Sequence, residues 1–135
     1  MPLVIKLDAQ EEITINGVTL RNSKQSRADL RVITPARIVR EAERISPERA
    51  SRTPAGGLHA LIVRCLEVFD PEDAPVDAVH DALVAQISVL PPAQQGVLME
   101  VGHMVADGRF NDALRALKPV LEDQERCGVR VGKAS

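Results

Sequence analysis

Residues 13–20 have the sequence ITINGVTL, in which two short β-branched runs flank Asn16-Gly17. Asn and Gly tolerate the positive φ angles that both central residues of a type I′ turn require. This stretch therefore predicts an antiparallel β-hairpin whose arms are residues 13–15 and 18–20. Residues 3–7 (LVIKL) and the alternating stretch 29–34 predict two more strands on either side of the hairpin.

Residues 35–45 fit two interpretations. Pro35 follows Thr34 and is a good helix start, and Ile38, Ala42 and Ile45 recur at helical spacing. The same stretch also suits one more strand, ending before Ser46. The residues alone leave both interpretations open.

From Ser46 onward the pattern predicts helices. Ser46-Pro47 and Thr53-Pro54 each place a capping hydroxyl before a proline suited to the first helical position. Four apolar stripes at spacings of three and four follow Thr53, and they are separated by Asp70-Pro71, Pro91-Pro92 and Gly108. The predicted class is α+β: a small N-terminal antiparallel sheet of four or five short strands, followed by about four helices.

The length of 135 residues predicts a single domain. We expect residues 1–45 to be mainly β, residues 46–128 to be helical, and residues 129–135 to be a frayed tail. Hydrophobic residues make up 44% of the chain, so its core can form without metals or disulfides. Cys65 and Cys127 are too few for a disulfide framework. With no signal-peptide core and no run long enough to span a bilayer, we expect a soluble cytoplasmic protein with no membrane contact.

Aromatic residues are nearly absent, at 1% of the chain with no Tyr or Trp. Nucleic-acid modules that stack bases on exposed rings therefore have only two candidates, Phe69 and Phe110. This scarcity counts against such modules.

Charge is distributed unevenly. Residues 1–64 hold eleven basic and seven acidic residues, a net charge of +4, and residues 65–135 hold six basic and twelve acidic residues, a net charge of −6. An anionic partner is therefore plausible for the N-terminal half only.

The basic residues concentrate between Arg21 and Arg52, where arginine dominates. A guanidinium can bind phosphate through two parallel hydrogen bonds. The alternative is a solvated face whose arginines form ion pairs with Glu41, Glu43 and Glu48.

No pattern predicts an enzyme, a metal site or a cofactor site. His59, His80 and His103 lie on three different predicted helices without metal-ligand spacing, so we interpret them as surface or boundary residues. Gly56-Gly57 is weak evidence for a phosphate-binding loop, and close helix packing is the better interpretation. We therefore name no catalytic, metal-binding or cofactor-binding residue.

Several short motifs resemble those of the flagellar biosynthesis repressor FlbT family. They are, in order, MPL (1–3), IKL (5–7), INGV (15–18), RN (21–22), VRE (39–41), SPERA (46–50) and TPA (53–55), with weaker likeness at FDP (69–71) and AL (113–114). The resemblance covers the whole chain. It favours a strand over residues 35–45, because relatives carry bulky apolar residues just before Arg-Glu. Residues 56–61 depart from the family pattern, which is basic and then aromatic at that point.

The resemblance implies a non-enzymatic, post-transcriptional regulator of flagellin expression. Family members are associated with the untranslated leader of flagellin messenger RNA and with a companion regulator, FlaF. A basic β face would then hold RNA phosphates, and unpaired bases would supply specificity. The candidate RNA-binding residues are Arg21, Lys24, Arg27, Arg31, Arg37, Arg40 and Arg44. The sign of the regulation, repressing or activating, stays open. The alternative is a protein-binding adaptor that engages flagellin or a companion regulator through its helices.

Self-association is also expected. The strand at residues 3–7 would expose unpaired backbone groups along one edge, and a second copy could satisfy them. A two-fold homodimer is the commonest closed solution. The alternative is a monomer in which a helix or the 129–135 tail covers this edge.

Overall fold

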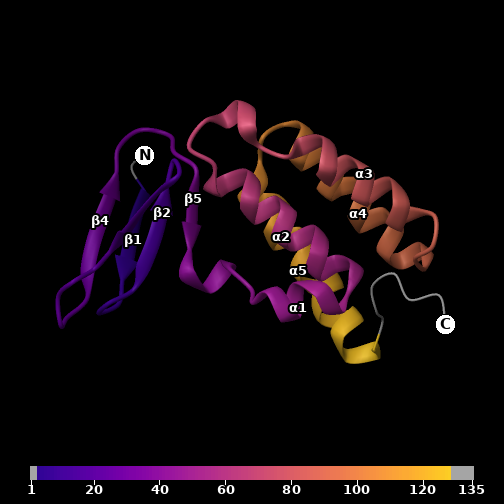
Figure 1. The fold of residues 1–135 in the computed structure, drawn as a ribbon, viewed down its shortest axis with the longest axis horizontal. Coiled ribbons are helices and arrows are strands. Elements are labelled where there is room, and N and C mark those ends of the chain that lie inside the picture. Colours follow the sequence, from indigo (N-terminus) through magenta and orange to yellow (C-terminus); the bar gives the residue numbers. More distant parts are fainter. Residues whose placement is uncertain (1–2, 129–135) are drawn as a thin grey trace.

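The strands of the protein precede its helices along the chain and lie at one end of the molecule (Figure 1). The computed structural model describes residues 3–128, so the predicted frayed tail at residues 129–135 lies outside the described residues. The strands are β1 (Leu3–Leu7), β2 (Glu12–Ile15), β3 (Val18–Arg21), β4 (Ala28–Val32) and β5 (Ile38–Arg40). Antiparallel strands followed by helices confirm the predicted α+β class.

The five strands form two small sheets. The outer sheet contains β1 and β4, and the central sheet has the order β3-β2-β5. Ile5 and Leu7 of the outer sheet pack against Ile13 and Ile38 of the central sheet in one buried cluster. Stacking two sheets buries these side chains, which a single flat sheet of the same strands would leave open on that face.

The predicted hairpin joins β2 and β3. Ile15 pairs with Val18 across the turn, and Asn16 and Gly17 have φ angles of +50° and +84°. Both central residues therefore adopt the left-handed backbone that a type I′ turn requires. Gly17 also lies against the distant backbone of Phe69, because a Cβ on Gly17 would lie 2.5 Å from the Phe69 Cα.

Residues 35–45 contain a strand, as the resemblance favoured, followed by a single 3₁₀ turn, η1 (Glu41–Glu43). In β5, Ile38 belongs to the cluster between the sheets, whereas Val39 is fully buried in the helical core. Neighbouring residues of a strand point to opposite faces, so only a strand lets these two side chains reach two different cores.

Five α-helices follow. The first is a short helix that begins at the Ser46 cap, in addition to the four stripes that the sequence predicted. They are α1 (Pro47–Arg52), α2 (Pro54–Glu67), α3 (Val76–Ile87), α4 (Pro92–Ala106) and α5 (Phe110–Cys127), with a 3₁₀ turn η2 (Pro71–Asp73) before α3. Within residues 3–128, none of the helices is long and apolar enough to cross a membrane.

The two predicted helix caps are present. The Ser46 hydroxyl accepts a hydrogen bond from the Arg49 amide at 3.1 Å, and the Thr53 hydroxyl accepts one from the Gly56 amide at 2.9 Å. A Cβ on Gly56 would lie 2.8 Å from the Arg49 carbonyl oxygen, so this glycine lets α1 and α2 meet closely. The packing interpretation of Gly56 is therefore confirmed.

Helix α2 is the centre of the helical layer. It packs against α1, α3, α5 and β5, and α4 packs against α3 and α5 (Figure 1). The helical core is almost wholly aliphatic, and Leu58, Ile62 and Leu66 of α2 are fully buried in it. The order of layers is therefore outer sheet, central sheet, helices.

Gly17→Ala should lower the free energy of unfolding by about 2 kcal/mol or more. The left-handed backbone at this residue costs a side chain about 1–2 kcal/mol, and the new Cβ would also overlap the backbone at Phe69. Gly108→Ala is the matched control, because Gly108 has φ +75° but no neighbour within 4 Å. Denaturant unfolding of both variants tests this, and equal losses would contradict the close contact at Gly17.

Candidate functional site

The seven predicted RNA-binding residues are spread over both sheets. Arg21 ends β3, Lys24 and Arg27 lie in the loop before β4, Arg31 lies on β4, Arg37 precedes β5, Arg40 ends β5, and Arg44 follows η1. The structure therefore does not gather them on one face. It separates them into residues that hold the layers together and residues that face outward.

Three of the seven are half-buried and serve internal contacts. Arg40 pairs with Glu11 at 3.1 Å and also donates to the Lys6 carbonyl oxygen at 2.6 Å, so it ties the central sheet to the outer sheet. Arg44 pairs with Glu67 of α2 at 3.0 Å. Arg37 donates to the carbonyl oxygens of Val68 and Phe69. These guanidiniums connect layers that lie far apart in sequence.

The other four are exposed, and two of them have carboxylate partners. Arg21 pairs with Glu12, which lowers the pKa of that carboxyl group, and Arg27 lies 3.4 Å from Asp8. Lys24 and Arg31 have no carboxylate within 4.0 Å among residues 3–128. They therefore keep their charge available to an external anion.

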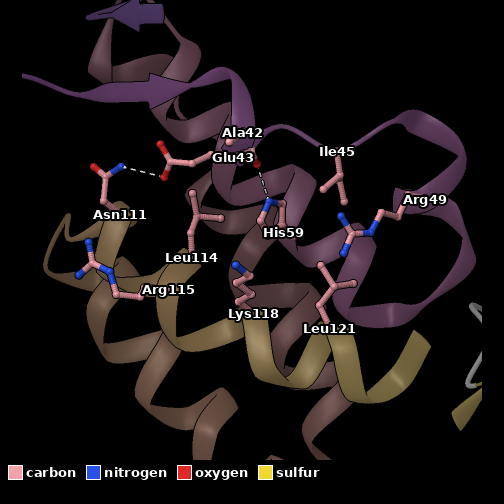
Figure 2. A pocket seen from close by; sticks show the side chains of 10 residues that line it. All are labelled: Ala42, Glu43, Ile45, Arg49, His59, Asn111, Leu114, Arg115, Lys118 and Leu121. Carbon is pink, nitrogen blue, oxygen red and sulfur yellow. Dashed lines mark hydrogen bonds between the residues drawn. The ribbon is translucent and has the colours of Figure 1, made fainter. Parts of the chain in front are cut away.

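A pocket of about 260 Å³ opens between three segments, namely the chain around η1, helix α2 and helix α5 (Figure 2). Its apolar wall is formed by Ala42, Ile45, Leu114 and Leu121. Its polar wall is formed by Glu43, Arg49, His59, Asn111, Arg115 and Lys118.

Three cations surround this pocket, but two of them have carboxylate partners. Arg49 binds Glu125 through two hydrogen bonds of 2.6 and 3.0 Å, and these bonds lower the pKa of the glutamate. Arg115 pairs with Asp112 at 3.0 Å. Lys118 has no carboxylate within 4.0 Å in the described part of the chain. The pocket can therefore take a small acidic group, with Lys118 as its uncompensated cation.

Arg115 and Lys118 were missed by the sequence analysis, because they belong to the acidic half of the chain. Only their spacing from Asn111 could have indicated that they lie together. Residues 111, 115 and 118 are four and three apart, so their side chains share one side of α5. The fold then brings Arg49 of α1 to the same opening, which no local pattern indicates.

His59 is buried, which corrects the prediction that it lies at the surface or its boundary. Its side chain is only 7% exposed, because η1 covers it. Its Nε2 atom donates to the Glu43 carbonyl oxygen at 2.7 Å, since a carbonyl can only accept (Figure 2). Burial lowers the pKa of this imidazole. His80 and His103 are exposed, as predicted.

The two cysteines have different environments. Cys65 is fully buried on α2, and burial raises the pKa of its thiol to about 11, so it is an inert core residue. Cys127 is exposed at the end of α5. Residues 3–128 contain no cluster of three His, Cys, Asp or Glu side chains that could hold a metal ion.

The lowered pKa of His59 makes stability pH-dependent. As the pH falls below the unfolded pKa of about 6.5, the unfolded chain binds a proton before the folded one does, so the free energy of unfolding should fall. His59→Gln should flatten this fall between pH 7 and pH 5. His103→Gln, a change at an exposed histidine of α4, is the control and should leave it unchanged. Unfolding titrations at several pH values measure both, and an undiminished slope in H59Q would contradict the assignment.

Comparison with known proteins identifies the family. The family model described as "Flagellar protein FlbT" matches residues 3–127, which is nearly the whole chain. No curated protein and no solved structure gives a significant match. The match spans both the strand layers and the helices described above, and the chain therefore belongs to the FlbT family of flagellar proteins.

Proposed function

We propose that the protein regulates flagellin expression after transcription, as a non-enzymatic cytoplasmic protein that binds the leader of flagellin messenger RNA. Membership of a flagellar protein family supports the flagellar part of this proposal. The RNA-binding part depends on the cations that the fold leaves free.

Two of the free cations lie on the outward face of the outer sheet. In the β1–β4 pairing, Lys6 lies opposite Asp29 and Val4 opposite Arg31, so Lys6 and Arg31 are diagonal neighbours on one face. All four side chains are exposed. Diagonal neighbours in a sheet lie about 7–8 Å apart at the backbone. Neither cation has a carboxylate within 4.0 Å among residues 3–128, and this pair is the observation that carries the proposal.

Lys24 extends this set from the adjoining loop, and we name Lys6, Lys24 and Arg31 the outer cations. Backbone phosphates would supply affinity through these residues, independently of sequence. Arg37, Arg40 and Arg44 then position the sheets and do not contact RNA directly. Specificity would come from unpaired bases of the leader, because side chains cannot enter the deep groove of an RNA duplex.

Replacing the outer cations should weaken RNA binding in a defined way. Each cation that neutralises a phosphate of a single strand contributes about −0.7 to the slope of log affinity against log salt. The triple variant K6Q/K24Q/R31Q should therefore reduce the slope by about 2. Fluorescence anisotropy with a labelled flagellin leader, at several salt concentrations, measures it.

Arg64→Gln is the matched control, because Arg64 is exposed on α2 and has no carboxylate within 4.0 Å in the described region. It should leave affinity and slope nearly unchanged. A leader that binds no better than a scrambled RNA, with no salt slope, would refute the proposal.

The second candidate function is a protein-binding adaptor that engages flagellin or a companion flagellar regulator. The helical half supports it, because Val89, which follows α3, and Met99 of α4 expose most of their apolar side chains. Such side chains suit a protein surface and contribute nothing to phosphate binding.

We also propose that the chain forms a two-fold dimer through β1. In the described part of the chain, β1 pairs with β4 on one side only, and Leu3 and Val4 are half-exposed. Antiparallel pairing with a second β1 would satisfy the free backbone groups and double the number of outer cations. Light scattering at micromolar concentration should give twice the chain mass, and a monomer mass would refute this.

A further inference from the structure

Phe69 is the exposed aromatic residue of the chain. The sequence contains two phenylalanines and no Tyr or Trp, and Phe110 lies in the helical core. Phe69, between α2 and η2, is 77% exposed. An exposed aromatic side chain is a frequent anchor of protein interfaces.

The backbone that carries this ring is held by two contacts. Gly17 of the hairpin turn packs directly on the Phe69 backbone, because a Cβ on Gly17 would lie 2.5 Å from the Phe69 Cα. In the second contact, the Arg37 guanidinium donates to the Val68 carbonyl oxygen at 2.6 Å and to the Phe69 carbonyl oxygen at 3.0 Å.

Arg37 is itself anchored to the hairpin turn. Its amide donates to the Asn16 side-chain oxygen at 2.9 Å, and the Asn16 amide donates to its carbonyl oxygen at 2.8 Å. Figure 1 shows the chain between α2 and α3 passing beside the strands. The ring of Phe69 is therefore presented from a fixed backbone, which reduces the entropy lost when a partner binds it.

Carboxylates follow the ring in sequence. Asp70, Glu72 and Asp73 are exposed, and none of them forms an ion pair within residues 3–128. The nearby Arg37 offsets only one of these three charges, so the surface stays acidic. We name Phe69, Asp70, Glu72 and Asp73 the Phe69 knob. Its charge repels phosphates and attracts a cationic rim.

We propose that the Phe69 knob docks into an apolar pocket rimmed by Lys or Arg on a partner protein. The ring would fill the pocket and the carboxylates would pair with the rim. This surface is separate from the outer cations, so the proposal goes beyond RNA binding and gives the adaptor function a defined site.

A second copy of the chain is a poorer occupant. Its own pocket beside α5 has an apolar wall and three cations, but Arg49 and Arg115 are already paired with Glu125 and Asp112. If the Phe69 knob of another copy docked there, its carboxylates would have to compete with Glu125 and Asp112 for these two arginines. A partner whose rim cations are free has no such cost.

Photo-crosslinking in cells that naturally produce the protein tests whether the Phe69 knob contacts such a partner. The chain carries p-benzoylphenylalanine in place of Phe69, and a matched chain carries it in place of Val84, which is 71% exposed on α3. We expect position 69 to crosslink one protein, at a peptide that contains apolar residues beside Lys or Arg. Position 84 should not crosslink that peptide.

Affinity measurements with the crosslinked protein then test the chemistry. Phe69→Ala should weaken its binding at least about 10-fold, as expected for an anchor residue, whereas Val84→Ala should change it less than two-fold. Asp70→Lys with Glu72→Lys should abolish binding, and reversing the partner's rim cations to Glu should restore it. Thermal melting should confirm that these exposed changes leave the fold intact.

Three outcomes would overturn the proposal: crosslinking of position 69 to RNA only, crosslinking to a second copy of the chain, or no crosslink. Failure of the charge reversal to restore binding would also overturn it. Affinity of F69A for the RNA leader should equal that of the unchanged chain, so failure of this proposal is distinguishable from failure of RNA binding.

Discussion

The fold depends on one strand whose two faces are buried in different cores. In β5, Ile38 faces the outer sheet and Val39 faces α2, and both side chains are almost inaccessible to solvent. Because adjacent residues of a strand point in opposite directions, this short segment fixes the distance and orientation of both neighbouring layers. The Asn111 side chain adds a direct link by donating to the Ile38 carbonyl oxygen at 2.9 Å. The positions of the outer cations and of the Phe69 knob follow from this junction.

Arginines reinforce the same junction from its margins. Arg40 reaches the outer sheet, Arg44 reaches α2, and Arg37 reaches the segment after α2. A planar guanidinium can donate to several acceptors at once, so one side chain can connect two elements that touch only at their edges. Much of the basic charge that distinguishes the N-terminal half therefore has a structural use. The net charge of a segment is thus a poor measure of the charge that it offers to a ligand.

Local signals predicted the elements of this fold, and long-range packing decided the rest. Asn16-Gly17 and Thr53-Pro54 act on their immediate neighbours, so the hairpin and the start of α2 could be predicted from the sequence. The burial of His59 depends on η1, and the Arg49–Glu125 pair joins residues 76 apart, so neither has a local signature. The division of the strands into two sheets likewise depends on which apolar faces meet. Of the candidate site, the residue types were predictable, but which cations remain free was not.

The exposed ring of Phe69 is not explained by the stability of the chain. Burying a phenylalanine side chain contributes about 1.5–3 kcal/mol, and apart from Phe110 the helical core is built from smaller, mainly aliphatic side chains. The ring lies outside that core although its backbone is held by the close approach of Gly17 and by two hydrogen bonds from Arg37. A fixed backbone and a solvated ring together cost conformational freedom without gaining burial in the free chain. A second surface that covers the ring would supply the missing burial, and the acidic residues beside the ring favour a cationic rim on that surface.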